Sequence, residues 1–290
     1  MTPSVKASQS SLYRHVEFLS TISPPRNYLN LESLNKVADY IAQEFNKYGA
    51  FAEYQTWLAD SREYKNIIAS YNPDKSRRLI VGAHYDVYGD YPGADDNASA
   101  VAGLLELARM VFEQKPDLDY RIDFVAYCLE EPPYFTTDQM GSYVHAKSLH
   151  DAQVDVIGMV CLEMIGYFSD EPNSQPYPLP ELASIYPSVA NFIIVVGIDS
   201  YAEFSYKVYQ LMTEGSGIDV QIINFPSADM LADMSDHRNY WKFGYNALMI
   251  NDTAFIRNPN YHTPSDTIDT LDFDKMTEVV NSTYRAIINL

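Results

Sequence analysis

The chain has few cysteines. Its 290 residues include only Cys128 and Cys161, which excludes a framework of several disulfides. Neither lies in a C-x-x-C motif or at a zinc-binding spacing from histidine, so nothing indicates a thiolate metal site. Both lie within apolar runs, where we expect buried thiols, although neighbouring strands would also allow one disulfide between them.

Positive charge and long apolar runs are also scarce. The 20 Lys and Arg face 39 Asp and Glu, and a surface of this sign repels phosphate backbones, so we expect no nucleic-acid partner. No run approaches the roughly 20 apolar residues of a membrane span, and residues 1–19 lack the features of a signal peptide. We therefore expect a soluble protein without a membrane partner. It would be cytoplasmic or, if a leader has been removed, periplasmic or secreted.

What remains is the composition of a globular protein, with 47% hydrophobic and 20% charged residues. The length suits one α/β domain as readily as two small ones, and we expect one domain over residues 1–290. No self-similar period indicates repeats.

The hydrophobic pattern alternates between helical and strand periodicity, which predicts a sheet covered by helices on both faces. Helices are expected at 11–19, 31–48, 98–112, 142–149, 202–212 and 273–288. Strands are expected at 51–57, 64–71, 79–84, 121–129, 156–162, 191–196, 220–224 and 246–250. Turn residues at 72–74 predict a hairpin between 64–71 and 79–84, and the proline-rich segment 170–187 predicts a long surface loop.

Three predicted strands lead to a histidine or to acids. His84 closes the strand 79–84, Glu130 and Glu131 follow 121–129, and Glu163 follows 156–162. Open α/β sheets place ligand sites at the carboxyl ends of their strands. Because acids gathered at one edge repel each other, bound cations are expected there.

Two further residues complete a possible metal centre. Asp96 lies in an acidic turn before a helix, where it either caps the helix or bridges two cations. His262 lies in a distant loop, and Asp86 is expected to orient the imidazole of His84. Two imidazoles and three carboxylates suit zinc, or manganese or cobalt, better than calcium.

The ordered motifs resemble the co-catalytic zinc aminopeptidases of the M28 peptidase family. They run from about residue 64 to 267 and are His84-Tyr85-Asp86, Gly93-Ala94-Asp95-Asp96-Asn97-Ala98-Ser99, Glu130-Glu131, Glu163, Ser235-Asp236-His237 and Tyr261-His262-Thr263. The resemblance implies an α/β fold with a mixed, mostly parallel central sheet and helices on both faces, arranged as a three-layer sandwich.

The resemblance also implies the roles of the site residues. Asp96 would bridge two zinc ions, with His84 and Glu163 completing one site and Glu131 and His262 the other. Glu130 would be the general base and acid acting on a water shared by the metals. Asp95 would not be a ligand, and the peptide bond after Asp96 is expected to be cis. Glu163 stands where many members have Asp, so we expect the second metal to bind more weakly or through one oxygen.

The expected activity is that of a metallo-aminopeptidase, which hydrolyses the first peptide bond of substrates with a free N-terminus. Tyr261 would hydrogen-bond the oxyanion or simply pack, and His237 would shape the site wall. An apolar pocket or the core would contain Met164, Ile165, Tyr167, Phe168 and Phe225. One alternative is a glutaminyl cyclase-like acyltransferase with one zinc, against which the retention of His84 argues. The other is a non-catalytic binding relative, which would have lost ligands.

Overall fold

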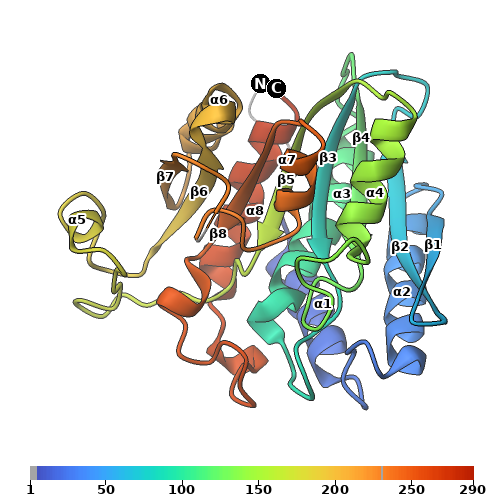
Figure 1. Ribbon diagram of the computed structural model, residues 1–290. Coiled ribbons are helices and arrows are strands. Elements are labelled where there is room, and N and C mark those ends of the chain that lie inside the picture. Colours follow the sequence, from blue (N-terminus) through green and yellow to red (C-terminus); the bar gives the residue numbers. More distant parts are fainter. Residues whose placement is uncertain (1–4, 230) are drawn as a thin grey trace.

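The computed structural model describes residues 5–229 and 231–290 and contains one mixed sheet within them (Figure 1). The strand order is β1-β2-β4-β3-β5-β8-β6-β7. The strands are β1 (Glu53–Ala59), β2 (Arg62–Tyr71), β3 (Arg78–His84), β4 (Arg121–Tyr127), β5 (Val156–Glu163), β6 (Phe192–Ile198), β7 (Asp219–Phe225) and β8 (Ala247–Asn251).

The centre of the sheet is parallel and its flanks are not. Strands β4, β3, β5 and β8 run parallel to one another, whereas β1 and β2 at one edge are antiparallel, and β6 is antiparallel to β8. Nearly every residue of β3, β4 and β5 is buried, because helices cover both faces of these strands. The predicted α/β fold with a mixed, mostly parallel sheet is confirmed.

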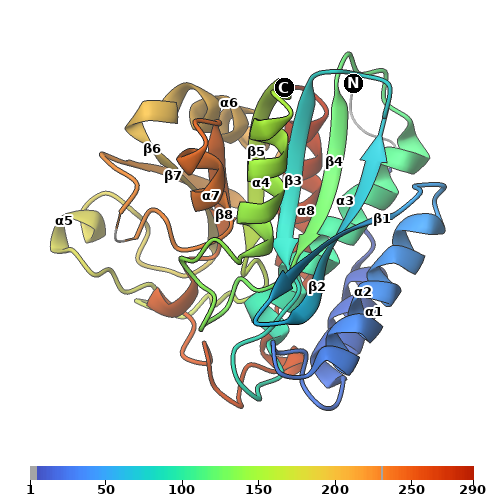
Figure 2. The same cartoon turned by 45° about the vertical axis from the view of Figure 1, so that its right-hand side comes forward.

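Helices lie on both faces of the sheet, as predicted (Figure 2). One face carries α1 (Gln9–Thr21), α2 (Leu31–Asn46), α3 (Ala100–Gln114), α6 (Ala202–Thr213) and α8 (Phe273–Ile287). The opposite face carries α4 (Gly141–Asp151) and α7 (His237–Lys242). The short segments are η1 (Ala94–Ser99), α5 (Pro180–Ala183), η2 (Asp199–Tyr201), η3 (Ala254–Ile256) and η4 (Ile268–Thr270).

Helix α8 illustrates how the sequence fixes these helices. The side chain of Asp272 accepts a hydrogen bond from the backbone N–H of Lys275 at 3.0 Å, which caps the first turn. Met276, Val279 and Val280 then recur at helical spacing and are fully or almost fully buried. This apolar stripe packs the helix against α3 and α6.

The predicted hairpin between 64–71 and 79–84 is wrong. The hairpin instead joins β1 to β2 through Asp60 and Ser61, whose φ angles of 48° and 63° suit a two-residue turn. The other edge of β2 pairs with β4, which lies between β2 and β3. Residues 72–77 therefore connect two strands that are not neighbours in the sheet, so they do not form a hairpin turn. Helix α3 then carries the chain from β3 back to a parallel β4.

Outside the sheet, the segment 170–187 is a long loop that contains the short helix α5, far from the main helices in Figures 1 and 2. Sequence periodicity missed α5 and α7, since four and six residues are too few to show it. Both cysteines are free and buried, as expected of core thiols. In the described residues, no helix is long and apolar enough to cross a membrane.

Candidate metal centre and adjoining pocket

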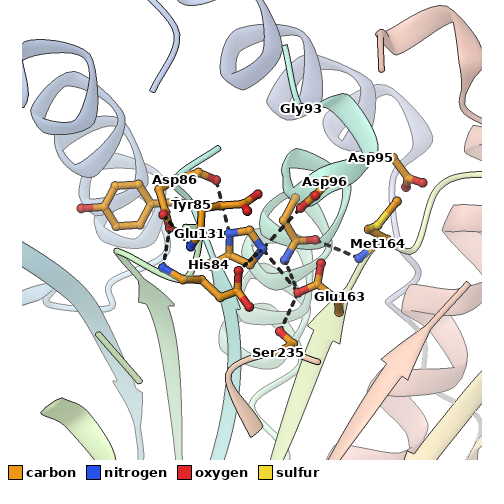
Figure 3. Close-up of polar contacts among 12 residues, drawn as sticks. His84, Tyr85, Asp86, Gly93, Asp95, Asp96, Glu131, Glu163, Met164 and Ser235 are labelled. Carbon is orange, nitrogen blue, oxygen red and sulfur yellow. Dashed lines mark hydrogen bonds and ion pairs between the residues drawn. The ribbon is translucent and has the colours of Figure 1, made fainter. Parts of the chain in front are cut away.

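The ends of three central strands bring three of the predicted ligands, His84, Glu131 and Glu163, close to Asp96 (Figure 3). His84 is the last residue of β3 and Glu163 the last of β5. Strand β4 ends at Tyr127, earlier than predicted, and Leu129 with a φ of 65° redirects the chain so that Glu130 and Glu131 enter the same region. The site therefore lies at the carboxyl edge of the sheet, where such folds place their ligands.

The two carboxylate oxygens of Asp96 face different histidines. Nε2 of His84 lies 3.4 Å from Oδ1 of Asp96 and 3.3 Å from Oε2 of Glu163. Nε2 of His262 lies 3.0 Å from Oδ2 of Asp96 and 3.3 Å from Oε2 of Glu131. The residues thus form two clusters that share one carboxylate.

Buried polar atoms without partners test whether these clusters suit cations. Oε1 of Glu131 is buried and has no hydrogen-bond partner among the described residues, and buried Nε2 of His262 has only its close approaches to the carboxylates of Asp96 and Glu131. A buried polar atom left in this state costs free energy, which a coordinated cation would offset. Imidazole nitrogens and carboxylate oxygens are ligands that zinc accepts, so the donor set fits a divalent cation.

The clusters perturb the titration of their members. Burial raises the pKa of Glu130 well above its ordinary value; the charge of His84 opposes this shift, and those of Glu131 and Glu163 add to it. Burial also lowers the pKa of His262, but its contacts with Asp96 and Glu131 outweigh this and raise the pKa to about 9. Without metal, the site therefore keeps protons that a cation would have to displace.

Glu130 lies at the edge of the same centre. Its Oε2 is 3.8 Å from Nε2 of His84, farther than the oxygens of Asp96 and Glu163. His84, Glu130 and Glu131 also form a third group whose ligand atoms lie within 4.8 Å of one another. Glu130 thus lies beside the two clusters, and its distances alone do not distinguish a metal ligand from a proton carrier.

Asp86 supports the two glutamates through their backbone. Its Oδ1 accepts the N–H of Glu130 and its Oδ2 accepts the N–H of Glu131, each at 3.1 Å. Nδ1 of His84 lies 3.3 Å from the backbone oxygen of Asp86 and 3.6 Å from its carboxylate. The hydrogen-bond partner of the imidazole is thus the backbone oxygen of Asp86, whereas the carboxylate of Asp86, which was expected to orient the imidazole, holds the backbone of the adjacent acids.

Asp266, which the sequence reasoning missed, supports the segment of Asp95 and Asp96 through the backbone in the same way. Its two oxygens accept the N–H groups of Asp95 and Asp96 at 2.8 and 3.1 Å. Its only sequence signal was its place four residues after His262.

The Asp96–Asn97 peptide bond is cis, as the resemblance implied. Gly93 has a φ of 59°, and a Cβ there would lie 2.3 Å from the backbone oxygen of Asp96, so this turn requires glycine.

Aromatic rings hold His262 in place. Its imidazole stacks between Tyr261, at 3.8 Å between ring centroids, and Tyr88, at 4.0 Å. Tyr261 also lines the adjoining pocket.

Two other residues of the sequence motifs point away from the clusters or the pocket. Nε2 of His237 hydrogen-bonds the backbone oxygen of Ala232 at 2.6 Å, and His237 is not among the residues that line the pocket. The carboxylate of Asp95 accepts from the Gly166 N–H and the Asn258 amide instead of facing the clusters.

A pocket of about 270 Å³ opens beside the metal centre. Its lining is mainly apolar and includes residues of three strands and the 170–187 loop: Ile194, Val196, Ile223, Phe225, Met249, Tyr177 and Tyr186. Buried Gln175 ties the loop to the strand end by donating a hydrogen bond to Oγ1 of Thr253 at 3.0 Å. Met164 and Phe225 line the pocket as expected, whereas Ile165 and Phe168 belong to the core and Tyr167 is outside the lining.

Sequence comparison finds similar proteins in bacteria and fungi. The uncharacterized protein YfbL of Escherichia coli (strain K12) is 41% identical over 98% of this chain and 88% of its own length. Leucine aminopeptidase 1 of Fusarium vanettenii is 25% identical over 91% of this chain and 64% of its own length. A probable zinc metalloprotease of Pyrenophora teres f. teres is 25% identical over 83% and 57%, so the chain spans less than two thirds of these two longer proteins.

Solved structures share the fold. A leucine aminopeptidase precursor from Bacteroides thetaiotaomicron superposes with a TM-score of 0.74, 20% identity and full coverage of both chains. A glutaminyl cyclase from the same species gives a TM-score of 0.72 at 20% identity, covering 99% of each chain. The sequence pattern of peptidase family M28 matches residues 66–287, most of the chain. The chain therefore belongs to peptidase family M28.

Proposed function

We propose that the chain is a zinc-dependent aminopeptidase that removes the first residue of peptides with a free N-terminus. The observation that carries the proposal is the shared carboxylate of Asp96 between two clusters, next to an apolar pocket. Membership of a peptidase family supports hydrolysis of peptide bonds. Relatives named as zinc metalloproteases and leucine aminopeptidases support the metal and the exopeptidase activity.

The proposed metal ligands are the five predicted ones. Asp96 would be shared, with His84 and Glu163 on one side and Glu131 and His262 on the other. Bound zinc would supply Lewis acidity, making a water easier to deprotonate and stabilising charge on the carbonyl oxygen. Asp86 and Asp266 hold the backbone of two of the ligand-bearing segments, 130–131 and 95–96, in place through pairs of N–H groups.

Glu130 is the proposed proton carrier. It lies beside the clusters, is buried, and is the acid least engaged by the two histidines. Burial raises the pKa of its carboxyl, which brings it closer to the range where a group both accepts and returns a proton near neutral pH. It would take the proton from the attacking water and deliver it to the leaving amine.

The pocket and the acids around it suit the first residue of a peptide. The carboxylates favour a protonated amine and disfavour an acidic end group. The apolar lining favours a hydrophobic first side chain, and its volume of about 270 Å³ accommodates a leucine or methionine side chain. Tyr261, which lines the pocket and stacks on His262, would donate a hydrogen bond from its phenolic hydroxyl to the carbonyl oxygen.

The test compares a leucyl peptide with its N-acetylated form, using zinc-saturated protein and mass spectrometry of the products. Release of free leucine from the unblocked peptide alone is the expected result. Equal cleavage of both peptides, or release from the C-terminus, would contradict the aminopeptidase assignment. A peptide with N-terminal glutamine should be shortened; loss of ammonia without shortening would assign the chain as a cyclase.

A further inference from the structure

The turn of residues 22–30 joins α1 to α2 and supports the loop 85–93, which runs from β3 to η1. Arg26 in this turn is only 1% exposed, and its guanidinium donates four hydrogen bonds to backbone oxygens. The acceptors are Tyr85 at 2.9 Å, Leu19 at 2.8 Å, and Pro92 and Gly93 at 2.7 Å each. Both ends of the loop are therefore tied to one side chain.

The two ends of this loop adjoin ligands of the proposed metal centre (Figure 3). Tyr85 directly follows His84, and Gly93 lies three residues before Asp96. A Cβ at Gly93 would lie 3.1 Å from Nη2 of Arg26, so the guanidinium packs directly against this turn. Arg26 thus fixes the main chain on the approach to two of the five proposed ligands.

Asn27 holds the middle of the same loop. Its Nδ2 donates to the backbone oxygen of Gly89 at 2.6 Å and to Oδ1 of Asp90 at 2.9 Å. The neighbouring Tyr88 stacks on the imidazole of His262, with 4.0 Å between the ring centroids. Through this ring, the turn also supports a third proposed ligand.

The turn that provides this support is itself restrained. Nδ2 of Asn30 donates to the backbone oxygen of Pro25 at 2.7 Å, and Oγ of Ser33 donates to that of Pro24 at 2.6 Å. The two proline rings also restrict the backbone φ angles. A restrained turn can hold the 85–93 loop in one conformation.

The positive charge of Arg26 makes its choice of partners informative. Burial lowers the pKa of the guanidinium to about 10, and the charges of Asp266, Asp96 and Asp86 oppose this shift, so the group stays protonated at neutral pH. Arginine commonly pairs with a carboxylate. Among the described residues, however, all hydrogen bonds of Arg26 go to backbone oxygens. The nearby acids are therefore left for a cation.

We propose that Arg26 and Asn27 are positioning residues for the metal centre, acting through the 85–93 loop. Because Asp96 is shared between the two clusters, loss of Arg26 weakens the binding of both ions, whereas loss of Asn27 acts mainly on the ion held by His262. The turn lies outside residues 66–287, which the family pattern matches. The inference rests on the proposed two-metal centre, and its test measures metal binding rather than peptide hydrolysis.

The test titrates metal-free protein with zinc in competition with a chromogenic chelator. Arg26→Lys keeps the charge but loses the fork of donors that reaches both ends of the loop. Both zinc ions should bind about 10-fold more weakly, the lower end of what groups supporting metal ligands contribute. Asn27→Ala should weaken one ion by about as much and leave the other unchanged.

Asn246→Ala is the matched control for Asn27→Ala. Nδ2 of Asn246 also donates to a backbone oxygen, that of Ile157 at 3.0 Å. Both residues lie where β5 and β8 begin, at the opposite edge of the sheet from the ligands. This variant should bind both zinc ions like the wild type.

Arg26→Gln separates position from charge. A buried positive charge repels a metal cation, so if the charge were what mattered, its removal would tighten zinc binding. If the hydrogen bonds position the ligands, Arg26→Gln should weaken zinc binding as Arg26→Lys does. Tighter binding by Arg26→Gln together with unchanged binding by Arg26→Lys would overturn the proposal.

Thermal unfolding with and without zinc separates positioning from general destabilisation. If Arg26 only stabilised the fold, Arg26→Lys would lower the midpoint equally in both states and leave the zinc affinity unchanged. That result would overturn the proposal, as would a wild-type protein that binds no zinc. If no Arg26 variant folds, Asn27→Ala decides, and a zinc affinity equal to that of Asn246→Ala would refute the inference. A wild type that binds zinc but releases no leucine from a leucyl peptide would refute the proposed function and leave this inference standing.

Discussion

Replacing Glu130 with glutamine tests the division of roles between two adjacent acids. The substitution keeps the size of the side chain but removes its charge and its ability to take up a proton. The backbone N–H of Glu130 is held by Asp86, so the glutamine side chain starts from the same place. Since Oε2 of Glu130 lies 3.8 Å from His84, beyond the other contacts of that imidazole, both metals should remain bound.

The expected loss of rate follows from the double use of this residue. General acid–base groups contribute about 10²–10⁴-fold, and Glu130 would both accept and return the proton. We therefore expect kcat to fall by about 10⁴-fold, which corresponds to roughly 5 kcal/mol in the activation free energy. The assay measures kcat on a leucyl peptide together with zinc content by elemental analysis.

Glu131→Gln is the matched comparison. Oε2 of Glu131 lies 3.3 Å from Nε2 of His262, so the variant loses an anionic ligand of one ion. Its zinc content should fall, and its activity should recover in part when zinc is added in excess. The reasoning is refuted if Glu130→Gln keeps near-normal kcat. It is also refuted if added zinc rescues Glu130→Gln and fails to rescue Glu131→Gln. The third group, with His84, Glu130 and Glu131 together, would then be the metal site.

Three further outcomes are expected. Zinc binding at pH 7 should release protons, because the pKa of His84 is raised well above its ordinary value and that of His262 to about 9. Calorimetry measures this release through the heat of zinc binding in buffers of different ionisation enthalpy. A heat of binding that is the same in all these buffers would contradict the prediction. Ile223→Trp should fill the pocket and lower kcat/KM for leucyl substrates more than for alanyl ones, and an equal effect on both would remove the pocket from substrate selection. Burial lowers the pKa of His15 to about 3, so folding stability is lost as pH falls from about 6.5 towards 3. In His15→Gln, the slope of unfolding free energy between pH 6.5 and 4.5, measured in urea, should decrease by about 1.4 kcal/mol per pH unit, and an unchanged slope would contradict this.

The central strands could be predicted because they are continuous apolar runs ending in polar groups. His84 and Glu163 each close such a run, and this pattern led directly to the edge of the sheet where they meet. The pairing of β2 was mispredicted because a strand's partner depends on which neighbour covers its edge, and local turn residues do not report this. The Asp60-Ser61 turn carries no Asn-Gly signal, although both residues adopt left-handed φ values.

The supporting residues were harder to predict than the ligands. Asp266 acts through two backbone N–H groups that are 170 and 171 residues away in the chain, and no local pattern encodes such a contact. The pocket lining was equally hard to predict, since the sequence around Ile194 and Ile223 indicates only that they lie in strands. Ile165 and Phe168 differ little in sequence context from Met164, but they turn into the core instead of the pocket.

The anchoring of consecutive backbone N–H groups by Asp86 and Asp266 has a consequence for how the protein exchanges metal. Neither carboxylate is a proposed ligand, and each fixes a ligand-bearing segment through the main chain. The conformational entropy of these segments is therefore lost when the chain folds and not when an ion arrives. Loading then needs little rearrangement, and the choice among zinc, manganese and cobalt is left to the coordination chemistry of the ion and its supply in the cell.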